Sequence, residues 1–137
     1  LLCAGITTWS PLRHWNVGPN SKVAVVGLGG LGHMAIKLAK GLGADVTLFS
    51  RSADKEADAK QLGADRIIIS TDPEAMAAAA GTFDFILDTV PYAHDLNPYV
   101  QALAVSGSLV VVGYLGALED QLNTMPMVFS RKTVAGS

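Results

Sequence analysis

A glycine-rich stretch at residues 23–34 constrains the fold more than any other part of the chain. It reads Val-Ala-Val-Val-Gly-Leu-Gly-Gly-Leu-Gly-His-Met, an apolar run followed by a glycine cluster and then by apolar residues at helical intervals. Gly27, Gly29 and Gly32 have the G-x-G-x-x-G spacing of a turn that receives a dinucleotide pyrophosphate. The first glycine permits the tight turn, the second lets backbone approach the phosphates, and the third lets the helix approach the strand. The stretch therefore predicts a dinucleotide-binding turn, the alternative being a glycine-rich turn in another α/β fold.

Within this turn, the residues expected to contact the coenzyme are Gly27, Leu28, Gly29, Gly30, Leu31 and Gly32. The helix that follows would direct its free N–H groups and the positive end of its dipole at the phosphates.

Strand-like and helix-like segments alternate along the rest of the chain. Strands are expected at 22–26, 45–49, 66–69, 83–87, 108–112 and 132–135, and helices at 31–42, 53–62, 73–80 and 96–104. Such alternation requires right-handed crossovers and gives a parallel sheet covered by helices on both faces. We therefore expect an α/β fold: a single Rossmann-type domain of three layers (αβα) with a doubly wound sheet of about six strands. Residues 1–17 are expected to form a partly helical segment ahead of the domain at 18–137.

Composition excludes several classes of function. The chain has 137 residues and a formal net charge of −2, with no cluster of Lys and Arg, so a nucleic-acid partner is not expected. No uninterrupted run of about 18 apolar residues occurs, so no membrane span is expected. A single cysteine and the lack of a secretory signal favour a cytoplasmic protein. The chain begins at Leu1 rather than Met, which indicates a piece of a longer protein.

The residues after the second predicted strand indicate which dinucleotide binds. An acidic residue usually accepts hydrogen bonds from the adenosine ribose at this position, whereas this chain has Ser50-Arg51-Ser52. Asp45 lies at the opposite end of the strand. Hydroxyl and guanidinium groups suit a 2′-phosphate, and Lys55 adds a second cation. The pattern predicts NADP(H) rather than NAD(H), with Ser50, Arg51 and Lys55 as the discriminating residues. The alternative is that Arg51 and Lys55 are simply solvated.

The histidines do not suggest a metal site, because His14, His33 and His94 have no metal-ligand spacing. His33 opens the helix after the glycine turn and is a candidate either for a pyrophosphate contact or for a capping role. Asp88, at the end of the fourth predicted strand, is expected to organise the following loop rather than to act in acid–base chemistry.

Several separate segments together resemble the zinc-dependent medium-chain alcohol dehydrogenases, and most closely the cinnamyl alcohol dehydrogenase branch. They are the glycine turn at 27–34, Ser50-Arg51-Ser52, Leu62-Gly63-Ala64-Asp65, Asp88-Thr89-Val90-Pro91, and the two ends at 1–7 and 131–137. The resemblance runs along essentially the whole chain. It implies a parent enzyme that interconverts primary alcohols and aldehydes with NADP(H) and a catalytic Zn²⁺.

The resemblance also implies roles for individual residues. Cys3 would be a zinc ligand in the intact parent only, and residues 1–17 would be the junction helix from the boundary with a catalytic domain. The residues that would lie near the coenzyme, many of them at its nicotinamide end, are Thr7, Thr89, Val90, Val112, Gly113, Tyr114 and Ser137. The remaining zinc ligands do not occur in this chain, so this portion alone is expected to be inactive.

The resemblance further implies partners for the whole protein. An alcohol or aldehyde substrate would reach the coenzyme through the catalytic domain. A homodimer would pair through the edge strand at 132–135 or the segment before it. Two other readings remain open: a zinc-free quinone or enoyl reductase, against which Cys3 argues, and a non-catalytic NADP(H)-sensing module.

Overall fold

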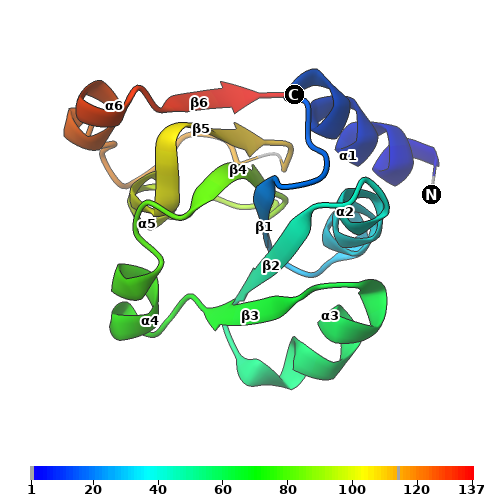
Figure 1. Ribbon diagram of the computed structural model, residues 1–137. Helices are drawn as coiled ribbons and strands as arrows, with labels where there is room; N and C mark the ends of the chain where they lie inside the picture. The colour runs from blue at the N-terminus through cyan, green and yellow to red at the C-terminus, as the bar shows by residue number, and fades with distance from the viewer. Residues whose placement is uncertain (1, 114) are drawn as a thin grey trace.

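The computed structural model describes residues 2–113 and 115–137, so the expected nicotinamide contact at Tyr114 lies outside the described residues. Six parallel strands form one sheet in the order β3-β2-β1-β4-β5-β6 (Figure 1). This order, with strand succession reversing between β1 and β4, is that of a Rossmann-type doubly wound fold. The predicted fold class is confirmed.

The elements follow the expected alternation. The strands are β1 (Lys22–Val26), β2 (Asp45–Ser50), β3 (Arg66–Ile69), β4 (Phe83–Asp88), β5 (Leu103–Val111) and β6 (Thr133–Gly136). The helices are α1 (Leu2–His14), α2 (Gly30–Gly41), the 3₁₀ turn η1 (Ala53–Lys55), α3 (Glu56–Leu62), α4 (Pro73–Ala78), α5 (Asn97–Ala102) and α6 (Met125–Ser130). None of the described helices is long and apolar enough to cross a membrane.

Two apolar cores lie on opposite faces of the sheet, because successive strand residues point to opposite sides. Val23 and Val25 of β1 belong to a core that α1, α2 and α3 cover, whereas Ala24 and Val26 belong to a core that α4 and α5 cover. Figure 1 shows these helices on the two sides of the sheet. Apolar side chains therefore cover both faces of β1, so polar functional groups can lie only at the ends of the strand.

Two segments differ from the sequence-based expectation. The helix expected at 96–104 ends at Ala102, and β5 begins at Leu103 rather than at 108. The pairing of β4 with β5 shifts register between Phe83 and Phe85. The shift accompanies a positive φ of 63° at Ser106 and a tight approach at Gly107, where a Cβ atom would lie 2.8 Å from the Phe83 carbonyl oxygen. Through this irregularity β5 continues across residues that lack the alternation of apolar and polar side chains typical of a strand.

The second difference is α6, which lies in a segment that the sequence did not resolve into an element. Pro126 stands in its first turn, where proline's missing N–H costs nothing. The helix ends at Arg131, which has a left-handed φ of 51°. The helix leads into β6, the edge strand next to β5.

Candidate functional site

The turn between β1 and α2 needs two of its glycines for steric reasons. Gly27 follows β1 with a φ of 90°, and an added Cβ atom would lie 3.1 Å from Val90 Cγ2. At Gly32 an added Cβ atom would lie 2.1 Å from the Gly27 carbonyl oxygen, far inside contact distance. Gly32 therefore sets how closely α2 approaches β1, as the sequence predicts.

The other two glycines of the turn face open space. Within residues 2–113 and 115–137, no atom lies within 4 Å of a Cβ added at Gly29 or at Gly30. Both residues are exposed, and Gly29 provides no side-chain cap for α2. The first N–H groups of this 12-residue helix are therefore free to bind an anion. His33 Nδ1 lies 2.7 Å from the Gly29 carbonyl oxygen, so this side chain contacts the backbone of the turn rather than capping the free N–H groups of α2.

A cavity of about 700 Å³ opens beside this turn at the carboxyl ends of β1, β2, β3 and β4. Ligands of doubly wound sheets bind at this edge. The predicted residues that line the cavity are Gly27, Leu28, Ser50, Arg51, Lys55 and Val90. The further lining residues that the sequence did not identify as site residues include Ser70, Thr71, Tyr92, His94, Asp95 and Tyr99. Ile69 pairs with Ser50 in the parallel register of β2 and β3. Once the sheet order is known, Ser70 can therefore be placed at the same edge of the sheet as Ser50.

One wall of the cavity carries cations and hydroxyl groups. The Ser50 side chain is buried and donates to the Ser52 carbonyl oxygen at 2.9 Å, so its hydroxyl holds the turn after β2. Thr71 Oγ1 donates to the Arg51 carbonyl oxygen at 3.1 Å, which ties this turn to the end of β3. None of the ion pairs in the described part of the chain includes Arg51 or Lys55, and both residues are exposed. Two cations thus face the cavity without a carboxylate partner.

Acidic groups near β2 do not replace the ribose-binding carboxylate. Asp54 accepts a short hydrogen bond from the Ser52 hydroxyl and does not line the cavity. Asp45 lies at the amino end of β2, where Arg66 Nη1 donates to its carboxylate at 2.9 Å. Both observations agree with the sequence-based expectation that no ribose carboxylate stands at the end of β2. Among the described residues, the acidic residue that lines the cavity is Asp95, on the loop after β4.

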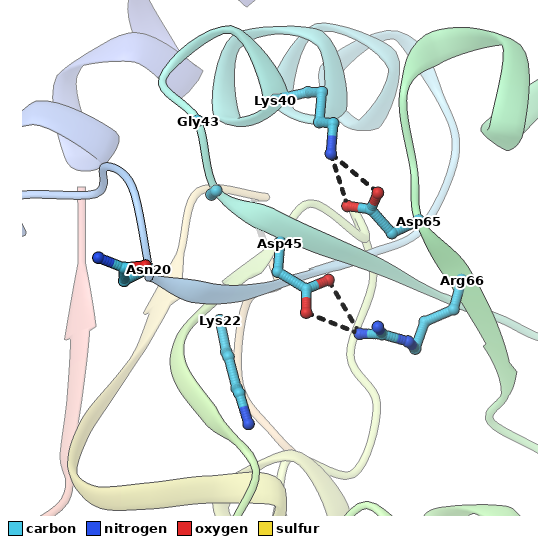
Figure 2. Close-up of a pocket in the computed structure, with 8 residues that line it drawn as sticks. Asn20, Lys22, Lys40, Gly43, Asp45, Asp65 and Arg66 are labelled. Carbon is cyan, nitrogen blue, oxygen red and sulfur yellow. Dashed lines mark hydrogen bonds and ion pairs between the residues drawn. The ribbon is translucent and has the colours of Figure 1, made fainter.

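A second pocket of about 510 Å³ lies at the amino ends of β1, β2 and β3 (Figure 2). Most of its charged groups form ion pairs with one another. Lys40 Nζ lies 2.8 Å from Asp65 Oδ1, and Arg66 pairs with Asp45 as described above. The pocket is at the opposite end of the strands from the glycine turn, so we assign it a structural role.

The wall opposite the cations is the loop after β4. Asp88 is fully buried at the end of this strand, and its Oδ1 accepts a hydrogen bond from the Val90 N–H at 3.1 Å. Its Oδ2 lies 2.5 Å from His94 Nε2. Burial raises the pKa of the Asp88 carboxyl, and the His94 ring and the Val90 N–H offset part of that increase. The Asp88 side chain therefore organises the loop backbone, as expected, through a histidine partner that the sequence did not reveal.

The remaining predicted coenzyme residues fall into three places. Thr89 Oγ1 donates to the Val26 carbonyl oxygen at 2.6 Å, and the N–H groups of Val112 and Gly113 donate to the Asp88 carbonyl oxygen. These contacts gather the ends of β1, β4 and β5. The Ser137 N–H donates to the Val111 carbonyl oxygen beside them. Leu31 is half-buried in the first turn of α2, and Thr7 lies on α1, outside the cavity lining.

Cys3 lies on α1 and is exposed. Its Sγ atom is 3.8 Å from Thr7 Oγ1. Among the described residues, no group of three or more His, Cys, Asp and Glu side chains could hold a metal ion. A catalytic zinc needs about three protein ligands, so the residues of this chain do not by themselves fit that metal.

Comparisons with known proteins place this geometry in a family. Residues 30–137 match a family model described as zinc-binding dehydrogenase. The chain is 50% identical over 137 residues to an NADP-dependent alcohol dehydrogenase from Mycolicibacterium smegmatis, a match that covers all of this chain and 39% of that protein. The chain thus spans about two fifths of the length of the curated relatives it matches.

Two solved structures agree with this match. A cinnamyl alcohol dehydrogenase from Sorghum bicolor superposes with a TM-score of 0.90 and 43% identity, over 99% of this chain and 39% of that one. A CAD from Helicobacter pylori complexed with NADP(H) superposes with a TM-score of 0.85 and 36% identity, over 98% of this chain and 38% of that one. The chain therefore belongs to the zinc-binding dehydrogenase family.

Proposed function

We propose that this chain is the NADP(H)-binding portion of a zinc-dependent alcohol dehydrogenase or aldehyde reductase. The observation that carries the proposal is the cavity at the carboxyl ends of the strands, with the open backbone of Gly29 and Gly30 beside it and the unpaired cations Arg51 and Lys55 on its wall. A relative named as an NADP-dependent alcohol dehydrogenase and a structural neighbour complexed with NADP(H) support the choice of coenzyme.

In this proposal the residues of the chain bind and orient the coenzyme. The backbone at Gly29 and Gly30 and the first N–H groups of α2 receive the pyrophosphate. Arg51 and Lys55 bind the 2′-phosphate, while Ser50 holds the turn that carries Arg51. Val90 and Leu28 supply apolar contacts on the cavity lining. When bound, the coenzyme would donate a hydride to an aldehyde as NADPH or accept one from an alcohol as NADP⁺.

The nicotinamide end is proposed to lie where the ends of β4, β5 and β6 meet. Val112, Gly113 and Ser137 gather there through their backbone hydrogen bonds to Asp88 and Val111. An added Cβ atom at Gly113 would lie 2.3 Å from the Val90 carbonyl oxygen, so this junction is tightly packed. Cys3 and Thr7 on α1 are proposed to approach the reacting atoms in the whole protein. Cys3 would contribute one zinc ligand, with the other ligands outside this chain.

Coenzyme titration tests the proposal. Dissociation constants for NADPH and NADH are compared by fluorescence for the purified protein that contains this chain and for a variant with Arg51→Ala and Lys55→Ala. Losing charge-assisted contacts to the 2′-phosphate is expected to weaken NADPH binding by at least about tenfold, with NADH affinity nearly unchanged. Lys37→Ala, which removes an exposed lysine outside the cavity on α2, is the matched control. Tighter binding of NADH than NADPH by the unmodified protein would refute the proposal.

A further inference from the structure

His94 connects two parts of the loop that forms one wall of the coenzyme cavity. Its Nε2 atom lies 2.5 Å from Asp88 Oδ2, and its Nδ1 atom lies 2.8 Å from the Tyr92 carbonyl oxygen. The His94 side chain is 18% exposed and the Asp88 side chain is fully buried. Tyr92 and His94 both line the cavity. The ring therefore fixes the loop to the end of β4.

The chemistry of these two contacts determines how many protons the pair holds. A carbonyl oxygen can only accept a hydrogen bond, so His94 Nδ1 must carry a proton. The contact between Nε2 and the Asp88 carboxyl also needs a proton, because two unprotonated atoms would face each other there with their lone pairs. Either the imidazolium faces a carboxylate, or a neutral imidazole accepts from a protonated Asp88. Both arrangements hold one proton more than a neutral histidine beside a carboxylate.

The surroundings favour keeping this proton. Asp88 is buried, which raises the pKa of its carboxyl and makes an unpaired carboxylate costly. The Tyr99 ring of α5 lies 6.1 Å from the His94 ring, and burial raises the pKa of the Tyr99 hydroxyl, so that group stays neutral. The other charged groups that face this region are Asp95 on the same loop and, from the opposite wall of the cavity, Arg51 and Lys55. With the extra proton, the buried pair has no net charge.

We propose that His94 is a positioning residue for the coenzyme, and that the proton it shares with Asp88 holds the 89–95 loop as the wall of the NADP(H) cavity. A side chain at position 94 that cannot donate toward Asp88 breaks this bridge. The loop then loses its anchor on β4, and coenzyme affinity falls. This inference rests on the proposed coenzyme function and adds a positioning residue to the same site.

The experiment measures the NADPH dissociation constant of the purified protein at neutral pH. Two variants separate the roles of the ring. His94→Gln keeps a donor toward Asp88, and His94→Ala removes both contacts. His14→Gln changes an exposed histidine at the end of α1 and is the matched control. Histidine side-chain ¹⁵N shifts report whether His94 Nδ1 carries the proton that its contact with the Tyr92 carbonyl oxygen requires. Circular dichroism verifies that each variant is folded.

The unmodified protein and His14→Gln are expected to bind NADPH equally well, with a protonated His94 Nδ1 in both. His94→Gln is expected to bind NADPH with little change, because its amide still donates toward Asp88. His94→Ala is expected to bind about tenfold more weakly, as for the loss of a hydrogen bond to a charged group.

Two results would overturn the inference while leaving the coenzyme assignment intact. One is a folded His94→Gln variant that binds NADPH as weakly as His94→Ala. The other is a folded His94→Ala variant with unchanged NADPH affinity. If the unmodified protein bound no NADPH, the proposed function would fail instead, so the two failures are distinguishable.

Discussion

Gly30 and Gly32 are two residues apart in α2, yet the fold makes different demands on them. A methyl group at Gly32 would overlap the Gly27 carbonyl oxygen, because the added carbon would lie only 2.1 Å away. Backbone cannot move aside as a flexible side chain can, so α2 would have to shift away from β1. We predict that Gly32→Ala lowers the free energy of unfolding by about 1–3 kcal/mol, the usual cost of overpacking. Urea denaturation followed by circular dichroism measures this.

At Gly30 the same methyl group would project into open space. Gly30→Ala is therefore expected to leave the free energy of unfolding nearly unchanged, or to raise it slightly, because alanine favours a helix. If pyrophosphate lies against this backbone, the added methyl group obstructs it and the NADPH dissociation constant rises. Titration of Gly30→Ala and Gly32→Ala with NADPH, beside their unfolding curves, separates the two effects. Unchanged NADPH affinity in Gly30→Ala would place the pyrophosphate elsewhere.

At the scale of elements, Asp65 joins α2 to two strands at the amino edge of the sheet (Figure 2). Lys40 Nζ donates to its carboxylate at 2.8 Å, and the Val46 N–H of β2 donates to it at 2.8 Å. These two hydrogen bonds lower the pKa of Asp65 from its ordinary value of 3.8. A lowered folded-state pKa gives stability that is complete above the ordinary value and is lost as the pH falls through the folded value.

We therefore predict that Asp65→Asn lowers the free energy of unfolding at neutral pH, by on the order of 1 kcal/mol since the pair is partly exposed. The difference from the unmodified protein should shrink as the pH falls below the ordinary carboxyl value and vanish once Asp65 is protonated in both states. Denaturant titrations at neutral and strongly acidic pH measure this. Asp120→Asn, in the exposed segment between β5 and α6, is the control. A difference that stayed constant with pH would contradict the ion-pair explanation.

The elements that the sequence predicted well are those with a periodic pattern and a sharp end. β1 and α2 have both, because apolar periodicity runs up to glycines whose spacing has a mechanical reason. The sequence predicts the start of β5 at residue 108, five residues after its actual start at Leu103. The reason is that the left-handed Ser106 and the tightly packed Gly107 interrupt the alternation of apolar and polar residues. α6 was not expected because it is short and has no side-chain cap, whereas α4, of the same length, begins at the capping residue Asp72 followed by Pro73. For the site, the cationic wall was predictable from residues next to one strand end. The pairing of Asp88 with His94 was not, because a loop without periodicity brings the two side chains together.

At the scale of the whole molecule, β6 leaves one edge of the sheet unpaired. Among the described strands β6 bonds to β5 alone, and an unpaired strand edge is a template for pairing with another chain. The helix before it, α6, exposes Val128 and Phe129, whose exposed fractions are 79% and 80%. This apolar surface adjoins the open edge. We therefore predict that the protein is a homodimer in which β6 and α6 of two copies meet.

Sedimentation velocity tests this prediction with Val128→Glu and Phe129→Glu combined. Burying two carboxylates against apolar side chains is costly, so the double variant is expected to sediment as a monomer. Val105→Glu changes a residue that is 74% exposed at the start of β5, away from α6 in sequence, and should leave the dimer intact. Since Val128 and Phe129 neither line the cavity nor belong to the residues proposed to bind the coenzyme, the monomer should still bind NADPH. A dimer that persisted in the double variant, or that dissociated equally in Val105→Glu, would show that copies of this chain meet through a different surface.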